Sequence, residues 1–418
     1  MRPKEPGTEF ATPGALAGRQ FVLLQGPSSR FWAHLGRALR SRGGAVARVG
    51  FCPGDRLFWS ESAGEYLPYR ERVEDFGSWL KDLITARGTT DIIMLGDGRV
   101  PHAAAAELIR SQGLPLGLWI VEHGYLRPDL VLIEPNGTGG TSTIPELFPE
   151  AAVEGPAENL GEWGGSFARY ALMDVAYHLS NLLFAPLRYP HYRPHSGIHP
   201  LVEYAGWLGK AVTIPWRRRQ RQRTLSALDA QSDPVFLYPL QLNQDMQLAN
   251  YGTGEPQLQT LMRVVHSFLA HADPATRLVV KVHPLDNGLA NWRAALARFG
   301  PRVLFLDGGD LDRLLSRVAG VVTINSTVGL AALQAGVPTL ALGDAVYKSA
   351  GLTDEQDLDG FWKQPNPPDR ERVTRFCAFV RTRFHVPGAF DGPGAVVAAS
   401  GLADWLSAQP SCIRAGVA

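Results

Sequence analysis

The sequence has little cysteine and almost no net charge. Its 418 residues include three cysteines, Cys52, Cys377 and Cys412, which are too few and too widely spaced for a disulfide framework or a zinc site with paired ligands. We therefore expect reduced, cytoplasmic thiols. There are 41 lysines and arginines against 40 aspartates and glutamates, so the chain lacks the broad positive field typical of nucleic-acid-binding proteins. No nucleic-acid partner is expected, and local groups must neutralise any anionic ligand.

Long apolar runs are also missing. No uninterrupted run approaches the roughly 20 residues that span a bilayer, so we expect a soluble or at most peripheral protein. Residues 1–20 contain no apolar stretch of the signal-peptide kind and are predicted to be a disordered tail. The motifs HExxH, GxSxG and CxxC are absent as well, which argues against zinc enzymes and the common hydrolases.

What the sequence does contain is a repeated α/β pattern. Short apolar runs alternate with helical patterns, first in FVLLQG, AVARVGF, DIIMLG and LGLWIVE, and later in PVFLYPL, RLVVKVHP, RVLFLDG and GVVTINS. Such alternation is typical of βαβ units and parallel sheets. The predicted fold class is α/β, with two Rossmann-like, doubly wound domains that face a central cleft, where the carboxyl ends of the strands bind ligands.

The predicted domain boundaries follow from changes in composition. Residues 134–165 are rich in Gly, Pro and Thr and are predicted to form a functional or disordered loop. The basic run WRRRQRQR at 216–223 begins a predicted linker, with contact to an acidic membrane surface as the alternative. The predicted organisation is a tail at 1–20, a first domain at 21–215, a linker at 216–233, a second domain at 234–365, and C-terminal helices at 366–418 that pack back on the first domain.

In the second half, a strand leads into a helix at Asn325, Ser326 and Thr327. Ser and Thr cap helices, and the free N–H groups with the positive end of the helix dipole favour an anion. We predict a phosphate site here. The alternative is a plain helix cap with no ligand.

His283 lies at the end of another strand of the same half, in the sequence KVHPLD. Pro284 disfavours helix at His283 and holds the backbone extended. Lys281 lies two residues earlier. We predict that these three residues contribute to the same ligand site, although a lone histidine is more often structural.

The densest polar cluster is EHGYLRPD, directly after the apolar strand LGLWIV. It contains Glu122, His123, Tyr125, Arg127 and Asp129. Two carboxylates, an imidazole, a phenol and a guanidinium emerge within eight residues of a strand end, which indicates a chemical centre. The alternative is a turn with an Arg127–Asp129 pair and a hydrogen-bonded histidine.

Smaller loops after other strands complete the candidate binding residues. The loop QGPSSRF lacks the established phosphate-loop spacings, and CPGDRLFW and LGDGR each place an Asp and an Arg beside Gly. A plain turn explains the latter two equally well. The candidates are Gln25, Gly26, Asp55, Arg56, Asp97 and Arg99.

Eight ordered blocks resemble a known family. They are FVLLQGP, FCPGDRLFW, LGDGR, EHGYLRPD, PLQLNQDMQL, KVHPLD, INSTVGL and LGDAVYKSAGLT, and they are similar to the motifs of the bacterial capsular polysaccharide biosynthesis and export family. The resemblance covers roughly residues 21–362. It implies a GT-B-type β-Kdo transferase that uses CMP-Kdo and builds the Kdo linker on a phosphatidylglycerol lipid.

The resemblance also implies roles for individual residues. His283 and Pro284 would form the family's His-Pro element, and Ser326 with Thr327 would contact the phosphate. Because a CMP-sugar carries one phosphate, no metal and no cofactor are expected beyond the donor itself. A retaining transfer needs a carboxylate nucleophile.

One position departs from the family pattern. Where the family usually has two adjacent acids before Gly-Tyr or Gly-Phe, this chain has Glu122 and then His123, and the second acid looks like the nucleophile in related Kdo transferases. Glu122, or Asp129, would then substitute as nucleophile, or His123 would serve as base, or the activity would be weakened.

The hypothesis is a cytoplasmic enzyme, peripheral on the inner face of the cytoplasmic membrane. It would transfer Kdo from CMP-Kdo to a phosphatidylglycerol-type acceptor, with basic residues at 188–193 and 217–223 against the anionic inner-membrane surface and other capsule assembly or export proteins as partners. Two alternatives stay open: a non-catalytic factor that binds the lipid-linked capsule glycan for export, and another GT-B transferase with a different CMP-activated donor.

Overall fold

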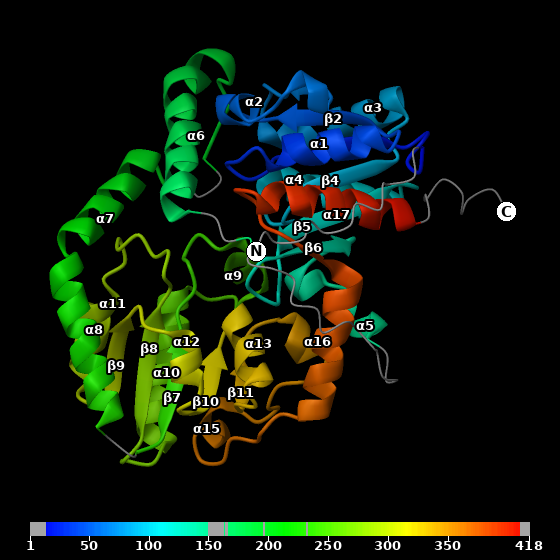
Figure 1. The fold of residues 1–418 in the computed structure, drawn as a ribbon. Helices are drawn as coiled ribbons and strands as arrows, with labels where there is room; N and C mark the ends of the chain where they lie inside the picture. Colours follow the sequence, from blue (N-terminus) through cyan, green and yellow to red (C-terminus); the bar gives the residue numbers. More distant parts are fainter. Residues whose placement is uncertain (1–13, 149–162, 164–165, 195–196, 231–232, 410–418) are drawn as a thin grey trace, which may run out of the picture. The chain divides into compact units, whose positions relative to one another are not determined.

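The computed structural model describes residues 14–148, 163, 166–194, 197–230 and 233–409. The chain forms two compact units, each with its own sheet (Figure 1). Unit 1 comprises residues 1–138, 157–193 and 384–418, and unit 2 comprises residues 139–156 and 194–383. Both units are therefore discontinuous in sequence.

The sheet of unit 1 has the strand order β12-β6-β5-β4-β1-β2-β3. The five strands from β3 to β5 are parallel, and β6 is antiparallel to both β5 and β12. Parallel strands buried on both faces read as continuous apolar runs, as in the first half of this sequence. The strands are β1 (Gln20–Leu23), β2 (Ala45–Gly50), β3 (Glu65–Pro68), β4 (Asp91–Leu95), β5 (Gly117–His123), β6 (Leu130–Pro135) and β12 (His385–Pro387).

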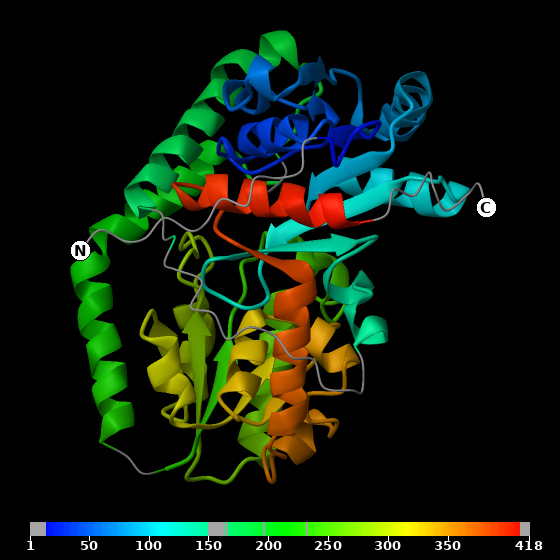
Figure 2. The ribbon, with the colours of Figure 1, turned by 45° about the vertical axis from the view of Figure 1, so that its right-hand side comes forward.

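Helices cover both faces of this sheet. One core lies between the sheet and the helices α1 (Phe31–Ser41) and α17 (Gly394–Ala408), which pack against each other (Figures 1 and 2). The other core lies beneath α3 (Phe76–Arg87) and α4 (Val100–Gln112). A third pair, α2 (Pro53–Leu57) and the long α6 (Phe167–Arg188), packs together at the end of β2. Two short 3-10 turns, Glu61–Ala63 and Val73–Asp75, complete the unit.

Unit 2 contains a five-stranded, fully parallel sheet of order β11-β10-β7-β8-β9. Its strands are β7 (Val235–Pro239), β8 (Arg277–Val282), β9 (Val303–Asp307), β10 (Val318–Thr323) and β11 (Thr339–Ala341). Its helices are α5 (Ile144–Leu147), α7 (Pro200–Val212), α8 (Ile214–Asp229), α9 (Met246–Tyr251), α10 (Gln257–His271), α11 (Trp292–Leu296), α12 (Leu311–Leu315), α13 (Thr327–Gln334), α14 (Val346–Ser349), α15 (Leu358–Phe361) and α16 (Arg370–Phe384), with 3-10 turns at Gly139–Thr141 and Ala297–Phe299.

The predicted α/β fold with two Rossmann-like domains is confirmed. Within each unit the first five strands follow the order 3-2-1-4-5, which is that of a doubly wound nucleotide-binding sheet. A pair of such domains is the architecture of GT-B glycosyltransferases. The predicted central cleft concerns the arrangement of the two units and stays a prediction.

The predicted boundaries differ from those of the units. The division falls between residues 193 and 194 rather than at 215. Residues 216–229 of the predicted linker belong to α8 of unit 2, where the Arg217 guanidinium pairs with Asp307. The return to unit 1 begins at Phe384 rather than at 366, because α16 belongs almost entirely to unit 2.

The two predicted loose segments differ as well. The tail is shorter than predicted, since Leu16 is fully buried and Arg19 forms a buried ion pair with Asp91. The predicted loop at 134–165 begins with the end of β6, whose Glu134 is fully buried, and includes α5. Residues 149–162, 164 and 165 of this loop lie outside the described residues.

Within the described part of the chain, no helix is both long and apolar enough to cross a membrane.

Candidate active site

Each sheet has one topological switch point, where the strand order reverses and ligands bind in open α/β folds. In unit 1 it lies between β1 and β4, and in unit 2 between β7 and β10. The segments that leave these four strands carry Gln25, Asp97, Gln241 and Asn325. Seven of the predicted site residues therefore lie next to a switch point, within one unit or the other: Gln25, Gly26, Asp97, Arg99, Asn325, Ser326 and Thr327. The others lie at or after the carboxyl ends of β2, β5 and β8.

At the switch point of unit 1, the loops after β1 and β4 are joined directly. Arg99 donates from Nη1 to the carbonyl of Gly26 at 3.2 Å. Gly26 is required here, because a Cβ atom would lie 2.3 Å from the Trp32 ring. Gln25 is buried and donates to the Tyr177 hydroxyl at 3.1 Å, and Asp97 is buried in the same unit. The partly exposed Arg99 is thus the cation that this loop pair offers to a ligand.

The predicted ligand contact at Asp55 is wrong. The carboxylate is fully buried, its Oδ1 pairs with the guanidinium of the equally buried Arg48 at 2.9 Å, and its Oδ2 accepts the N–H of Phe51. Asp55 therefore fixes the start of α2 from within the core. Its neighbour Arg56 is partly exposed and pairs with Glu61 on the unit surface.

Glu122 and His123 project to opposite faces of the sheet. Both lie in β5, opposite Leu132 and Val131 respectively, and successive side chains of a strand alternate between faces. Glu122 is half-buried on the α3 and α4 side. The exposed ring of His123 lies on the α1 and α17 side, edge-on to Phe390 at a centroid distance of 4.7 Å. The two side chains therefore cannot act from the same face of this sheet.

A hydroxyl pair links Glu122 to a second, buried carboxyl group. Thr138 Oγ1 lies 3.4 Å from Glu122 Oε2 and 2.9 Å from the Tyr125 hydroxyl, which in turn lies 2.8 Å from Oε1 of the fully buried Glu134. The arrangement positions Glu122 at the end of β5, with Gly96 of the neighbouring strand end beside it.

The remaining residues of the cluster shape the turn between β5 and β6. The Tyr125 N–H donates to His385 Nε2 at 3.0 Å, and Arg127 Nε donates to the carbonyl of Gly124 at 3.3 Å. Asp129 has a φ of 60°, in the left-handed region, and its carbonyl accepts the Gly388 N–H. The main-chain contacts of Tyr125 and Asp129 thus join this turn to β12.

In unit 2, the tautomer of His283 follows from a local hydrogen bond. Its Nδ1 accepts the N–H of Leu285 at 3.1 Å, so in the neutral ring Nε2 carries the proton. Pro284 is exposed, and its carbonyl accepts from Lys210 Nζ at 3.2 Å. The loop therefore holds the imidazole with an N–H donor at Nε2, the atom that a phosphate oxygen requires.

Lys281 precedes this loop and is largely buried at the end of β8. Burial lowers its pKa, and the carboxylate of Asp307 opposes that shift.

Asn325 braces the switch point of unit 2. Its amide nitrogen donates to the carbonyls of Gln247 and Tyr251, and its oxygen accepts from Gln241 Nε2 at 2.9 Å. Gln241 is in turn held by Gln257, whose Oε1 accepts the Gln241 N–H at 2.7 Å. With both amide donors used, Asn325 holds the loops after β7 and β10 together, and the predicted direct ligand contact at Asn325 is not what this arrangement favours.

Ser326 and Thr327 begin α13 as predicted. Ser326 is the N-cap, and its hydroxyl accepts the Val328 N–H at 3.2 Å. The Tyr347 hydroxyl donates to the Ser326 carbonyl at 2.7 Å and fixes the cap from the other side. Thr327 is the first helical residue, so its N–H and hydroxyl lie at the positive end of the helix dipole.

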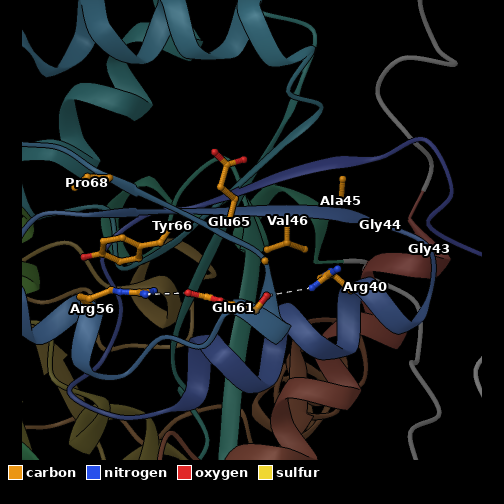
Figure 3. Close-up of a pocket in the computed structure, with 11 residues that line it drawn as sticks. Arg40, Gly43, Gly44, Ala45, Val46, Arg56, Glu61, Glu65, Tyr66 and Pro68 are labelled. Atoms are coloured by element: carbon orange, nitrogen blue, oxygen red, sulfur yellow. Dashed lines mark hydrogen bonds and ion pairs between the residues drawn. The ribbon is translucent and has the colours of Figure 1, made fainter.

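Two cavities differ in what they offer. A cavity of about 620 Å³ in unit 2 lies beside the Gln241–Gln257 network and is lined by Asn243, Leu248, Gln257, Leu258 and Trp292, among others. A hollow of about 920 Å³ in unit 1 lies along β2 and β3, with Arg40, Glu61 and Glu65 at its rim (Figure 3). The unit 2 cavity adjoins the candidate site, whereas the unit 1 hollow is lined by none of the predicted residues except Arg56.

Among the described residues, no group of three or more His, Cys, Asp or Glu side chains gathers in a way that would hold a metal ion.

Several site residues were missed in the sequence. Gln241 and Gln257 pair with residues 84 and 16 positions away, and Tyr177 reaches Gln25 across 152 positions. Thr138 and Glu134 lie in the segment 134–165, which was predicted as a functional or disordered loop, but neither side chain was given a role. Of these missed residues, only Gln241 lies in one of the ordered motifs, PLQLNQDMQL, and the motif predicts no role for its side chain.

Comparison with family models matches residues 90–387 to the family described as capsule polysaccharide biosynthesis protein. The chain belongs to this family. More than half of the chain lies within the match, and the resemblance predicted from the ordered motifs is confirmed.

Curated relatives of this capsule family match over most of their length. The capsule polysaccharide export protein KpsS of Escherichia coli is 28% identical over 90% of this chain and 97% of its own. The capsule polysaccharide modification protein LipB of Neisseria meningitidis serogroup B is 28% identical over 85% and 87%. Both relatives are named for capsule polysaccharide.

Similar solved structures include two β-Kdo transferases. KpsC of Thermosulfurimonas dismutans, a β-Kdo 2,7 transferase, covers 93% of this chain and 99% of its own, with a TM-score of 0.44 and 14% identity. Its β-Kdo 2,4 transferase covers 75% and 83%, with a TM-score of 0.39 and 17% identity.

Proposed function

We propose that this member of the capsule polysaccharide biosynthesis family is a glycosyltransferase that moves Kdo from CMP-Kdo to a phosphatidylglycerol-type lipid and so begins the capsule linker. The observation that carries the proposal is Glu122. It is a carboxylate at the carboxyl end of a Rossmann-like sheet, within reach of Thr138 and beside Gly96.

The donor half of the proposal rests on unit 2. His283 would donate from Nε2 to the donor phosphate. The N–H and hydroxyl of Thr327 would meet the same phosphate at the positive end of the helix dipole, with Ser326 as the cap that holds this helix start. That dipole contributes about 0.3–1 kcal/mol, so His283 and Lys281 must supply most of the charge stabilisation. The cavity beside Gln257 and Trp292 has room for the nucleoside.

The chemical step proposed is a double displacement. An oxygen of Glu122 forms a bond to the anomeric carbon of Kdo while the bond from that carbon to the phosphate oxygen breaks, and CMP leaves with the electron pair. A lipid hydroxyl then attacks the same carbon, Glu122 leaves as a carboxylate, and the hydroxyl proton passes to solvent. Configuration is retained because the carbon is inverted twice. No metal or cofactor enters this scheme.

A second candidate function is a non-catalytic factor that binds the lipid-linked capsule glycan for export. The observation that favours it is His123, which occupies the second acidic position of the family pattern and packs on Phe390 instead of facing the Glu122 side. The name of KpsS, capsule polysaccharide export protein, is compatible with this alternative.

The decisive experiment incubates the purified full chain with CMP-Kdo and phosphatidylglycerol vesicles, and measures CMP release together with the mass of the lipid product. CMP-sialic acid and a CMP-activated glycerophosphate donor are tested in parallel. We expect release of CMP from CMP-Kdo alone and a lipid heavier by one or more Kdo units. Release from another donor supports the other GT-B transferase, and no release from any donor, with an active control enzyme, supports the binding factor.

In this proposal the protein works at the cytoplasmic face of the inner membrane, where a CMP-sugar and a phospholipid acceptor meet. Other capsule assembly or export proteins would then receive the product. The exposed arginines of α8, among them Arg218, Arg219 and Arg223, remain available for an anionic surface, whereas Arg217 is paired with Asp307.

A further inference from the structure

The helix α6 of unit 1 buries a narrow face that carries polar groups together with the Tyr177 ring, which stacks on Phe58. Its buried residues are Tyr177, His178, Asn181 and Ala185, each at most 8% exposed. The Tyr177 hydroxyl lies 3.0 Å from Cys52 Sγ, and Asn181 Oδ1 accepts the Gly54 N–H at 2.7 Å. A surface helix normally buries its apolar face, so this helix needs another explanation.

The opposite face of α6 is an apolar row. It consists of residues at spacings of three and four, which share one face of a helix. From the first to the last, this row extends for about 22 Å. The members and their exposed fractions are Leu172 69%, Val175 42%, Leu179 50%, Leu183 56% and Leu187 84%. We call this set the α6 row.

The row cannot turn inward, because the buried face is fixed to α2. A Cβ atom at Gly54 would lie 2.4 Å from the Tyr177 ring, which shows how closely the two helices approach. Contiguous apolar surface of this extent marks an interaction site on a soluble unit.

Charge indicates what covers the row. The only acidic residue of α6, Asp174, is oriented toward the core side, where Ser28 Oγ lies 3.3 Å from its Oδ1 and His178 Nε2 lies 3.7 Å away. Exposed arginines lie at both ends of the helix, Arg169 before the row and Arg188 after it. A second copy of the helix would therefore bring arginines without acidic partners, whereas an anionic surface would satisfy them.

We propose that the α6 row lies on the surface of an anionic phospholipid membrane, with the helix parallel to the bilayer. The leucines enter the boundary between headgroups and acyl chains, and Arg169 and Arg188 contact lipid phosphates. The proposal rests on the proposed function only for the expectation that the acceptor is a lipid, since the docking itself needs no donor and no catalysis.

The test is flotation of the full chain with phosphatidylglycerol–phosphatidylcholine vesicles, in the absence of CMP-Kdo. The variant is Leu179→Ser with Leu183→Ser. The matched control is Leu147→Ser with Val396→Ser, whose side chains are 54% and 52% exposed on α5 and α17. We expect the α6 variant to lose at least about tenfold in vesicle partitioning, and the control to bind like the original chain. Far-UV circular dichroism and thermal unfolding establish that both variants are folded.

A second variant tests the charge. Arg188→Gln removes one phosphate contact, so we expect binding to the anionic vesicles to fall by about fivefold. Binding to vesicles of phosphatidylcholine alone should be weak for the original chain and for every variant. Equal flotation of the α6 variant and the control overturns the proposal. So does a change from dimer to monomer in analytical ultracentrifugation of the α6 variant, because a second copy would then cover the row. Flotation without any CMP release would leave the docking supported and the proposed transfer refuted.

Discussion

At the scale of single residues, each candidate side chain either holds its own loop in place or would contact the ligand, and only His283 is proposed to do both. His283 uses Nδ1 to hold its own loop, so the neutral ring carries its proton at Nε2. Asn325 uses its amide entirely within unit 2. Glu122 is held through Thr138 at a strand end. In the proposed transfer, His283 and Glu122 would therefore contact the donor, and Asn325 would have a positioning role.

His283→Asn separates these two duties. An asparagine before proline also accepts the N–H two residues later, so the loop keeps its shape, but the donor at Nε2 is lost. We expect the affinity for CMP, measured by isothermal titration calorimetry, to fall by about tenfold, in line with one charge-assisted hydrogen bond. Unfolding in urea should change little. Unchanged CMP affinity would contradict the assignment of this histidine to the phosphate.

Tyr125→Phe tests the hydrogen bond between Tyr125 and Glu134. The change removes a hydroxyl from the fully buried Glu134, at a cost of about 1–3 kcal/mol in the free energy of unfolding. A double-mutant cycle with Glu134→Gln, followed by urea denaturation, measures the coupling. Additive effects, within about 0.5 kcal/mol, would show that the two side chains do not interact.

The residue types of the site were largely predictable, but their geometry was not. Strand-end placement brought out Glu122, His283, Ser326 and Thr327. Alternation within β5 also separates Glu122 from His123, and this was not foreseen because the end of the strand could not be fixed from the sequence. Asp55 was misjudged because its partner, Arg48, lies in a strand whose arginine looked like a surface residue, and the burial of both is a tertiary effect.

At the scale of elements, the start of α4 contains a buried histidine that must stay neutral. His102 is fully buried, and its Nδ1 lies 2.8 Å from the Gly96 carbonyl, which it can only approach as a donor. Burial, with a smaller contribution from Arg99, lowers the pKa of His102 to about 3. The loop after β4, which carries Asp97 and Arg99, is thereby tied to the helix that follows it.

This histidine makes stability depend on pH. Its pKa is lowered in the folded state relative to about 6.5 in the unfolded state. Its contribution to the free energy of unfolding is therefore complete above pH 6.5 and is lost as the pH falls toward 3. Between pH 6.5 and pH 5 the loss is about 2 kcal/mol. We expect His102→Asn to remove this part of the decrease, as measured by urea denaturation at pH 7 and pH 5. An identical decrease in the variant and the original chain would contradict it.

Element prediction succeeded where apolar runs are flanked by glycine and failed where charge dominated. The parallel strands were found because they are buried on both faces and read as continuous apolar stretches. Residues 216–229 were taken for a linker because of their basic run, although arginine, glutamine, leucine and alanine all favour helix, and they form most of α8. The strand β6 follows β5 as the second arm of a hairpin, but the polar segment before it gave no strand signal, and its other partner, β12, is more than 240 residues away.

At the scale of the whole molecule, the order of strands explains why unit 1 needs the end of the chain. Its sheet ends in β12, and α17 covers α1 on one face. The guanidinium of Arg19 donates to the carbonyl of Leu406 at 2.6 Å, and Arg42 pairs with Asp404. Unit 1 is therefore complete only after residues 384–409 have been made.

A truncation tests this dependence. A chain that ends at Arg383 leaves one edge of β6 unpaired and uncovers the apolar core beneath α17. In limited proteolysis, we expect unit 1 of this truncated chain to be digested. Unit 2 keeps its own sheet and cores, so it should remain as a protease-resistant fragment. A control that ends at Gln409 should behave like the full chain. Equal protection of both units in the first truncation would contradict this account.

The two units also share one strand order, so each has a switch point with its own polar brace: Arg99 with Gly26 in unit 1, and Gln241 with Asn325 in unit 2. The fold class and the location of these sites at strand ends followed from the sequence. The unit boundaries did not follow from the sequence. Residues 139–156 belong to unit 2 and residues 384–418 to unit 1, and each segment is separated in sequence from the rest of its unit.

The central claim is that Glu122 carries the transfer. The most direct measurement compares the initial rate of CMP release from CMP-Kdo, with phosphatidylglycerol vesicles, for Glu122→Gln and for the matched variant Glu107→Gln on the exposed side of α4. We predict that Glu122→Gln lowers the rate by about 10³-fold or more, with the fold and CMP affinity retained, and that Glu107→Gln leaves it unchanged. Equal rates for the two variants would contradict the account.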